Sequence, residues 1–519
     1  MGLDIYWIGL LVLVPVVVII AGHETIMSLV ARGTSTEKKK QQQQKEEREI
    51  DPLDDEAAKF QRTFLRVYLL VIGSEWLQSP FTYSLFRNEK TLDEATVATL
   101  YIGTYAAAAA AALAAGHLTD RLGRRRACLA FCAAHSLAAA SVCFDGLPVL
   151  VLGRVLGGVA LTLLWTAFES WAVAEYNARG LARSSLSLGA MLGRMTTSKC
   201  VTAVAAGLLG HCVVLVLGSK IHPFILSVVL DVFAAALMMR TWNENWGTNP
   251  AAGADADADD GGKAVEAQEP TSSPSEKKTT TSLWDPRVWA MSFVACCSEG
   301  TIFLFMFFWP ETLQDARDRE RPGLPGDGDA IPHGVVFASF MAIMAVGALF
   351  FNLATAGPGG DGHEREVPAG TGRCRAALLT PTRLLEGALV VSAICFAVAA
   401  FVREEIGLFV SFLALEVCNG VYVPSVAYHR GTIVTDDARA RVYSLMNIPL
   451  FVFVVIALRT AGGGSDTGTG TTASSQPIFL ICAALLLVAA AVTSLYLHAE
   501  RRNPEGYSEI PGQDLASTG

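Results

Sequence analysis

The sequence predicts an all-α polytopic membrane protein, built from two six-helix halves plus one extra N-terminal transmembrane helix. The 519-residue chain is 52% hydrophobic and only 17% charged, and its mean hydropathy is +0.39. Its charges gather in a few stretches and leave runs of about 20 apolar residues, each long enough to cross ~30 Å of hydrocarbon. The longest polar interruption, residues 243–285, divides twelve of these runs six and six. That layout is typical of transporters made of two repeated halves.

The same composition excludes several classes of function. A soluble multidomain enzyme does not fit it, so no enzymatic activity is expected. The net charge of -9 and the pI near 5.6 argue against a nucleic-acid partner, because phosphate binding needs a concentrated basic surface. The eleven cysteines show neither a disulfide framework nor a zinc spacing. No metal and no other cofactor is therefore predicted.

Each apolar run is predicted to be a helix, because a backbone in lipid must satisfy its own hydrogen bonds and these runs are unlike barrel strands. A leading run covers about 5–22, and the twelve others begin near residues 64, 96, 126, 147, 188, 222, 288, 334, 379, 406, 442 and 476. The expected regions are an N-terminal transmembrane anchor (1–30), a charged cytoplasmic linker (31–62), the first half (63–242), a disordered acidic cytoplasmic linker (243–285), the second half (286–498) and a cytoplasmic tail (499–519).

The distribution of Lys and Arg predicts the orientation, since short cytoplasmic loops carry an excess of both. This rule places the start of the first six-helix half in the cytoplasm, because the loops then inside are the more basic ones. The leading run has Asp4 before it and Arg32 and Lys38 after it, so it should run from outside to inside. An uncleaved anchor is favoured over a signal peptide, because a basic n-region and a small-residue cleavage site are missing. The plasma membrane is the expected location.

A tight cytoplasmic turn after the second helix of the first half carries the motif GHLTDRLGRRR. Gly116 lets two helices approach closely and Gly123 permits the turn, while Asp120 can pair with Arg121 or Arg124 in contacts that break when the halves rock. The alternative is that these charges only set the topology. The motif resembles the signature loop of the major facilitator superfamily, which implies the fold of that superfamily.

Three charged residues in other helices of the first half have open roles. A charge inside a membrane helix costs about 3 kcal/mol on insertion scales, so it needs a partner or a wet cavity. Arg154, within GRVLGG, resembles the R-x-x-x-G element of the superfamily, and proton coupling and an ion pair with a carboxylate of the first helix both remain open. Glu169 is expected to close the inner gate against Arg121 or Arg124, with substrate contact as the alternative. Asp231 is a further coupling or structural charge.

Three carboxylates are expected near the middle of the membrane. Glu75 and Glu299 each lie ~16 Å into the first helix of their half. Each follows a serine, a match expected of internal repeats. Both are expected to face a central cavity, and Glu416 is the third carboxylate at bilayer depth.

Two cations in one helix, Arg194 and Lys199, indicate an anionic substrate. They are five residues apart, about 140° around a helix, so only a wide cavity can expose both. Cations at this depth are costly, and an anion would offset that cost through charge-assisted hydrogen bonds. The alternative pairs each cation with one of the carboxylates.

Three longer stretches are more specific than the signature loop. They read SEWLQSPF at Ser74–Phe81, AFESW at Ala167–Trp171 and LEVCNGVYVPS at Leu415–Ser425. On these stretches the chain resembles the eukaryotic molybdate-anion transporters, the domain-containing-5 branch of the superfamily. The resemblance covers most of the chain and includes the extra N-terminal helix. It implies oxyanion uptake by alternating access, and it implies that the position of Arg194 is basic in the family.

One departure from that family bears on the substrate. Where the family has Arg in an R-V-P-L run, this sequence has Asn447 in NIPL. Lys199 stands where relatives tend to have a neutral residue. A relocated positive charge would preserve anion affinity, or else the selectivity has changed.

The leading hypothesis is a secondary transporter that imports molybdate, since the ATP-binding pattern G-x-x-x-x-G-K-S/T does not occur. One carboxylate is expected to carry a coupling proton and the others to neutralise Arg154 or Lys199. The alternatives are a transporter of another small organic solute and a non-transporting sensor or scaffold. Besides its substrate and the lipid bilayer no partner is expected, and the protein is expected to be a monomer. The candidate substrate-binding residues are Arg194, Lys199, Asn447, Glu75, Glu299 and Glu416.

Overall fold

The computed structural model describes residues 4–15, 52–184, 188–246, 286–321, 331–355, 380–433, 439–462 and 475–497, and these residues are almost entirely helical. The helices of the first half are α2 (Pro52–Gln78), η1 (Ser79–Phe81), α3 (Thr82–Ser84), η2 (Leu85–Glu89), α4 (Glu94–Leu122), α5 (Arg124–Ser141), α6 (Leu147–Ala178), η3 (Leu181–Arg183), α7 (Leu188–Leu217) and α8 (His222–Thr241). The helices of the second half are α10 (Pro286–Glu320), α11 (His333–Thr355), α13 (Pro381–Phe401), α14 (Glu405–Ile433), α15 (Arg439–Gly462) and α16 (Ser475–Tyr496).

Each predicted apolar run of the two halves contains one long helix. In the described part of the chain, nine helices are long and apolar enough to cross a membrane. The others, including α2 and α5, carry more charge or are described over shorter apolar lengths. The prediction of an all-α polytopic membrane protein is confirmed.

Some helix ends differ from the sequence expectation. The helix α2 begins at Pro52 rather than near 63, inside the segment expected to be a linker. A proline in the first turn, followed by Asp54 and Asp55, favours a helix start, because it lacks an N–H that would go unpaired and the acids face the positive end of the helix dipole. At α4, the Asp93 carboxylate accepts the Thr96 N–H at 3.1 Å and the Thr96 hydroxyl at 2.6 Å. These bonds hold the pKa of Asp93 below its usual range.

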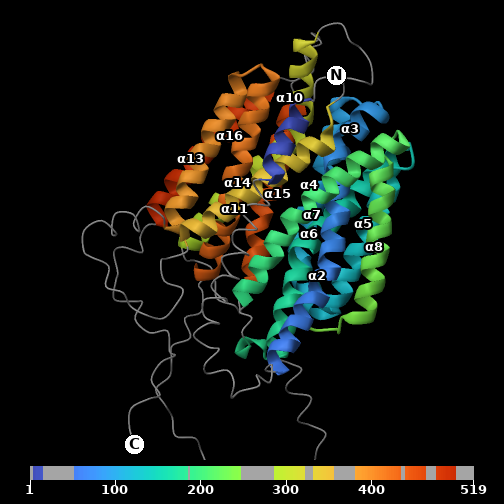
Figure 1. The fold of residues 1–519 in the computed structure, drawn as a ribbon, viewed down its shortest axis with the longest axis vertical. Helices are drawn as coiled ribbons and strands as arrows, with labels where there is room; N and C mark the ends of the chain where they lie inside the picture. Colours follow the sequence, from blue (N-terminus) through green and yellow to red (C-terminus); the bar gives the residue numbers. More distant parts are fainter. Residues whose placement is uncertain are drawn as a thin grey trace, which may run out of the picture.

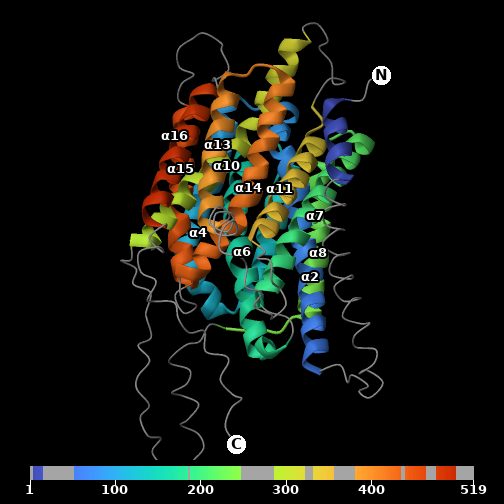
Figure 2. The same cartoon turned by 60° about the vertical axis from the view of Figure 1, so that its left-hand side comes forward.

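The helices form two bundles that meet along two seams (Figure 1). α2 to α8 pack mainly on one another, and so do α10 to α16. The seams are made by α4 with α15 and by α7 with α11. Figure 2 shows the same two bundles after a 60° turn, with α7 beside α11.

Aromatic side chains and glycines close the two seams near the end that the positive-inside rule places outside. Tyr101 packs edge-on against Phe307, and Tyr105 lies against Phe303 and Phe451. At the other seam Gly334 lies so close to Gly207 that a Cβ on Gly334 would stand 2.4 Å from the Gly207 carbonyl oxygen. This end is therefore closed by large aromatic rings at one seam and by the close approach of two glycines at the other.

The leading helix, Ile5–Pro15, packs across the outer end of both bundles. Arg317 of α10 donates to Asp4 at 2.8 Å and to Glu405 of α14 at 2.8 Å. Trp7 lies edge-on to His211 of α7, with ring centroids 5.6 Å apart. The rest of the predicted anchor lies outside the described residues, so its span across the membrane stays a prediction.

Candidate functional site

The predicted substrate-binding and coupling residues, apart from the signature loop, come from seven helices. Glu75 lies on α2, Arg154 and Glu169 on α6, and Arg194 and Lys199 on α7, while the others occupy α8, α10, α14 and α15. The side chains of Arg194, Asn447 and Asp120 lie outside the described residues. Their roles as substrate donors and gating acid stay predictions.

Lys199 presents its ammonium to an aromatic ring rather than to a carboxylate. Its Nζ lies 4.8 Å from the centroid of Trp165 on α6. No carboxylate of the described residues lies within ion-pair distance of it, although the charges of Glu169 and Glu299 act on it. The predicted neutralisation of Lys199 by a carboxylate is therefore not what this structure shows. The ring stabilises the cation through its π face and leaves its N–H groups available to an anion.

Glu299 has a cation that the sequence analysis missed. Arg430 Nη2 donates to Glu299 Oε1 at 2.9 Å, and the Tyr422 hydroxyl donates to the same oxygen at 3.3 Å. α14 continues through Pro424 to Ile433, so Arg430 lies on this helix and not in the loop that follows it. Tyr422 and Arg430 are about two helical turns apart, so both face α10.

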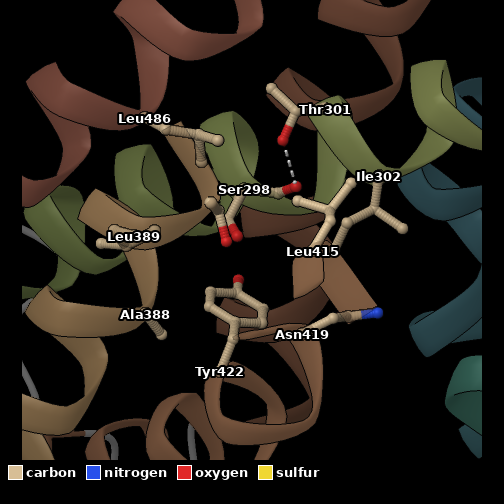
Figure 3. Close-up of a pocket in the computed structure, with 10 residues that line it drawn as sticks. Ser298, Thr301, Ile302, Ala388, Leu389, Leu415, Asn419, Tyr422 and Leu486 are labelled. Atoms are coloured by element: carbon tan, nitrogen blue, oxygen red, sulfur yellow. Dashed lines mark hydrogen bonds between the residues drawn. The ribbon is translucent and has the colours of Figure 1, made fainter. Parts of the chain in front are cut away.

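Glu416 is fully buried and receives a hydrogen bond from the Asn419 amide at 3.1 Å. Asn419 also lines a small pocket inside the second half, between α10, α13, α14 and α16. Figure 3 shows the Tyr422 hydroxyl pointing into this pocket, which Ser298 and Thr301 line as well. The pocket adjoins the Glu299 pair through Ser298 and Tyr422.

Glu75 pairs with a histidine rather than with an arginine or a lysine. Its Oε2 lies 3.0 Å from Nε2 of His135 on α5, and the other ring nitrogen, Nδ1, lies 2.7 Å from Oδ2 of Asp231 on α8. Glu75 is expected either to carry a coupling proton or to neutralise Arg154 or Lys199, and the partner described for it is His135. No sequence pattern predicts His135 as this partner, because it is a single histidine in the alanine-rich helix α5 and is marked only by its presence in an apolar run.

Arg154 packs on an aromatic ring. Its guanidinium carbon lies 5.3 Å from the centroid of the Phe86 ring, and its buried Nε has no hydrogen-bond partner among the described residues. The charge of Glu75 acts on Arg154 without a direct ion pair. Of the two roles left open for Arg154, the structural ion pair with the first helix is not present among the described residues.

The signature loop is anchored by a residue beyond α8. Gly123 has φ +103°, a conformation that favours glycine, and the next N–H group, that of Arg124, donates to the Asn245 carbonyl at 2.9 Å. Glu244 accepts the Arg125 N–H at 2.8 Å and lies 3.8 Å from Arg126. Arg121 is exposed. The ion pairs described for this loop join Arg125 and Arg126 to Glu244, and the gate contact of Glu169 with Arg121 or Arg124 stays a prediction.

Gly123→Ala should destabilise the protein by about 1–3 kcal/mol, because the backbone conformation is strained for alanine and an added Cβ would lie 2.5 Å from Glu244 Oε1. Gly180→Ala is the matched control. Gly180 has φ +65° but nothing within 4 Å of an added Cβ, so only the cost of about 1–2 kcal/mol for the left-handed conformation applies. Thermal unfolding in detergent measures both, and equal melting temperatures for the two variants would contradict the role of Glu244.

Three comparisons place these features among known proteins. The family model MFS_5, described as sugar transporters with 12 transmembrane helices, matches residues 38–357. A molybdate-anion transporter from Danio rerio is 28% identical over 464 residues, covering 84% of this chain and 87% of its own length. Its counterpart from Takifugu rubripes is 28% identical, covering 86% and 91%.

Solved structures share the fold at low identity. A D-xylose-proton symporter aligns with a TM-score of 0.57 and 12% identity, covering 84% of this chain and 97% of its own. The nucleoside transporter NupG aligns with a TM-score of 0.54 and 12% identity, covering 84% and 99%. The superfamily fold predicted from the signature loop is confirmed.

Proposed function

The chain belongs to the MFS_5 family of the major facilitator superfamily, and from that premise we propose that it is a secondary transporter for molybdate or a closely similar oxyanion. As a multi-pass integral membrane transporter, it is not an enzyme. Relatives that match over more than four fifths of the chain are named molybdate-anion transporters, which supports this substrate class.

The observation that carries the proposal is the environment of Lys199. Molybdate is a small tetrahedral dianion, so its site needs a fixed cation and several N–H or O–H donors. The Lys199 ammonium lies over Trp165 with no carboxylate of the described residues in ion-pair distance, so its donors can serve an anion. Arg194 precedes it on α7 by more than one turn and is proposed as a second cation, with Asn447 of α15 as a neutral donor.

The carboxylates are proposed to stay out of direct contact with the substrate. Glu299 is bound by Arg430 and Tyr422, and Glu416 is bound by Asn419. A sugar offers hydroxyl groups only and gives an unpaired intramembrane cation no counter-charge. The oxyanion is therefore favoured over the sugar that the family description mentions.

Alternating access is proposed to use the two bundles, 63–242 and 286–498, as rocking halves in the plasma membrane. The seams closed by Tyr105 and Gly334 would separate when the site opens outward. The seam contacts then belong to one state of the cycle. The protein is proposed to act as a monomer, because each chain contains both halves.

A ligand panel tests the substrate class. Ligands that bind only the folded state raise its stability by RT ln(1 + [L]/Kd), about 2.7 kcal/mol at 100 times Kd. Molybdate should raise the melting temperature of the purified protein, sulfate should do so less strongly, and D-xylose and a nucleoside should not. A shift with an uncharged solute and none with molybdate would favour the organic-solute alternative.

A further inference from the structure

The strongest unexplained feature is a buried chain of ionisable groups inside the first half. His135 and Asp231 are almost inaccessible, and the carboxylate of Glu75 is 27% exposed. The His135 ring has a carboxylate oxygen at each nitrogen, Asp231 Oδ2 at 2.7 Å and Glu75 Oε2 at 3.0 Å. These three groups therefore link a fully buried acid, Asp231, to a partly exposed one, Glu75.

The buried end of this chain is fixed. Asp231 Oδ1 accepts the Ser74 hydroxyl at 2.6 Å, and Oδ2 accepts the Ser136 hydroxyl at 3.3 Å as well as His135 Nδ1. An ionised carboxylate accepts such bonds without needing a proton of its own. The described contacts of Asp231 occupy both of its oxygens, so the contact on the other side of the ring, between His135 and Glu75, is the one considered for a proton that comes and goes.

The geometry requires one proton between His135 and Glu75. A neutral imidazole donates from one nitrogen and accepts at the other. With Nδ1–H directed to Asp231, a bare Nε2 would face a bare carboxylate oxygen of Glu75. The contact is stable only if Nε2 or Glu75 Oε2 carries a proton. The Gln78 amide nitrogen also lies against Nε2, and it donates to that atom when Nε2 carries no proton.

We infer that the Glu75–His135–Asp231 chain is the proton-binding site that couples anion uptake to a proton gradient. This inference rests on the proposed function. Glu75 takes a proton from water when the halves are open to the outside, the proton is shared with His135 Nε2, and it leaves through Glu75 on the inner side. Only O–H and N–H bonds form and break, so one proton enters and one leaves in each cycle.

The surroundings of the chain connect it to the moving seam. Trp76, next to Glu75 on α2, lies 5.5 Å ring to ring from Phe337 of α11 in the other half, and its indole N–H has no partner among the described residues. Adding or removing the proton changes the charge one residue from a contact between the halves. That position is suited to make seam closure depend on protonation.

Few other charged or titratable groups lie close to the Glu75–His135–Asp231 chain. Arg154 of α6 acts on Glu75, and the Cys132 thiol of α5 lies near Asp231. From α2 and α8 the facing groups are Glu75 and Asp231 themselves. Because Arg154 lacks an ion pair within the described residues, it is placed to receive the negative charge of Glu75 when the proton leaves.

The test separates coupling from transport with His135→Gln in proteoliposomes loaded with molybdate. Exchange of labelled for unlabelled molybdate moves no net proton, so it should stay within about threefold of wild type, whereas accumulation driven by acid outside should fall by at least about tenfold. His222→Gln, which removes a histidine at the outer end of α8, is the control and should change neither. Wild-type accumulation by His135→Gln overturns the inference, and so does loss of both activities in monodisperse protein.

A second variant keeps the inference testable if His135→Gln does not fold. Glu75→Gln keeps the hydrogen bond but cannot release a proton, so molybdate accumulation should no longer vary across pH ~5–8, the range in which histidine titrates. Accumulation by wild type that is itself independent of pH overturns the coupling site and leaves the transport proposal intact. Wild-type protein that neither exchanges nor accumulates molybdate overturns the transport proposal instead.

Discussion

Lys199→Gln is expected to weaken molybdate binding about 10- to 100-fold, because a charge-assisted hydrogen bond contributes about 1.5–3 kcal/mol. Glutamine retains one N–H donor group and similar reach but has no charge. The measurement is the apparent affinity for labelled molybdate exchange in proteoliposomes. The maximal rate should change less than the affinity, since the substitution removes binding and leaves the seams intact.

Two control variants sharpen this result. Lys199→Arg keeps the charge over Trp165 and should restore much of the affinity. Lys59→Gln removes an exposed lysine from the inner end of α2 and should have no effect. Equal losses in Lys199→Gln and Lys59→Gln would show that general charge, not the site, governs binding.

A second prediction concerns Arg194, the other cation proposed on α7. Arg194→Gln should abolish high-affinity uptake, and Arg194→Lys should restore it only in part, because an ammonium keeps the charge but loses the bidentate guanidinium fork. Unchanged affinity in Arg194→Gln would leave Lys199 as the main binding cation.

Gly334→Ala is expected to reduce molybdate exchange by at least about tenfold, because only a state with the outer seam open could accommodate the new methyl group. Its Cβ would lie 2.4 Å from the Gly207 carbonyl oxygen and 2.8 Å from His211 Cβ, both of them rigid parts of α7. The protein should still fold and bind substrate, since the collision arises between the halves and not inside either one.

Gly103→Ala on α4 is the matched control, since nothing lies within 4 Å of a Cβ there. Binding is followed by the shift in melting temperature with molybdate, and transport by exchange in proteoliposomes. If Gly334→Ala exchanges molybdate at the wild-type rate, the seam between α7 and α11 does not close during transport.

The helices were predictable from the sequence because their cause is local. Apolar length and the rule that lipid-exposed backbone satisfies its own hydrogen bonds predict each of them, and the signature loop predicts the superfamily. Helix ends were less predictable. Pro424 lies inside α14, so a helix end predicted at this proline would leave Arg430 outside the helix that carries it.

Pairing between side chains was less predictable, since it depends on which helix faces meet. Glu75 was matched to Arg154 or Lys199 by charge alone, but α5 places His135 between Glu75 and Asp231. Glu244 lies beyond the end of α8 and reaches the signature loop only because the chain folds back under α5. No spacing pattern in the sequence predicts this contact between Glu244 and the signature loop.

The non-transporting sensor or scaffold makes a different prediction for the buried charges. A scaffold gains nothing from Lys199 over Trp165 or from His135 between two acids, because intramembrane charges are costly without a use. Replacing such charges with neutral residues would stabilise a scaffold. In a transporter the same changes should lower substrate binding or coupling.

The most direct test is exchange of labelled molybdate by the purified protein in liposomes of defined lipid, with unlabelled molybdate inside and protein-free liposomes as background. We expect saturable entry of label that excess molybdate blocks, that sulfate slows weakly, and that D-xylose leaves unchanged. Entry no faster than in protein-free liposomes, from wild-type protein that is folded and monodisperse, would contradict the assignment of this chain as an oxyanion transporter.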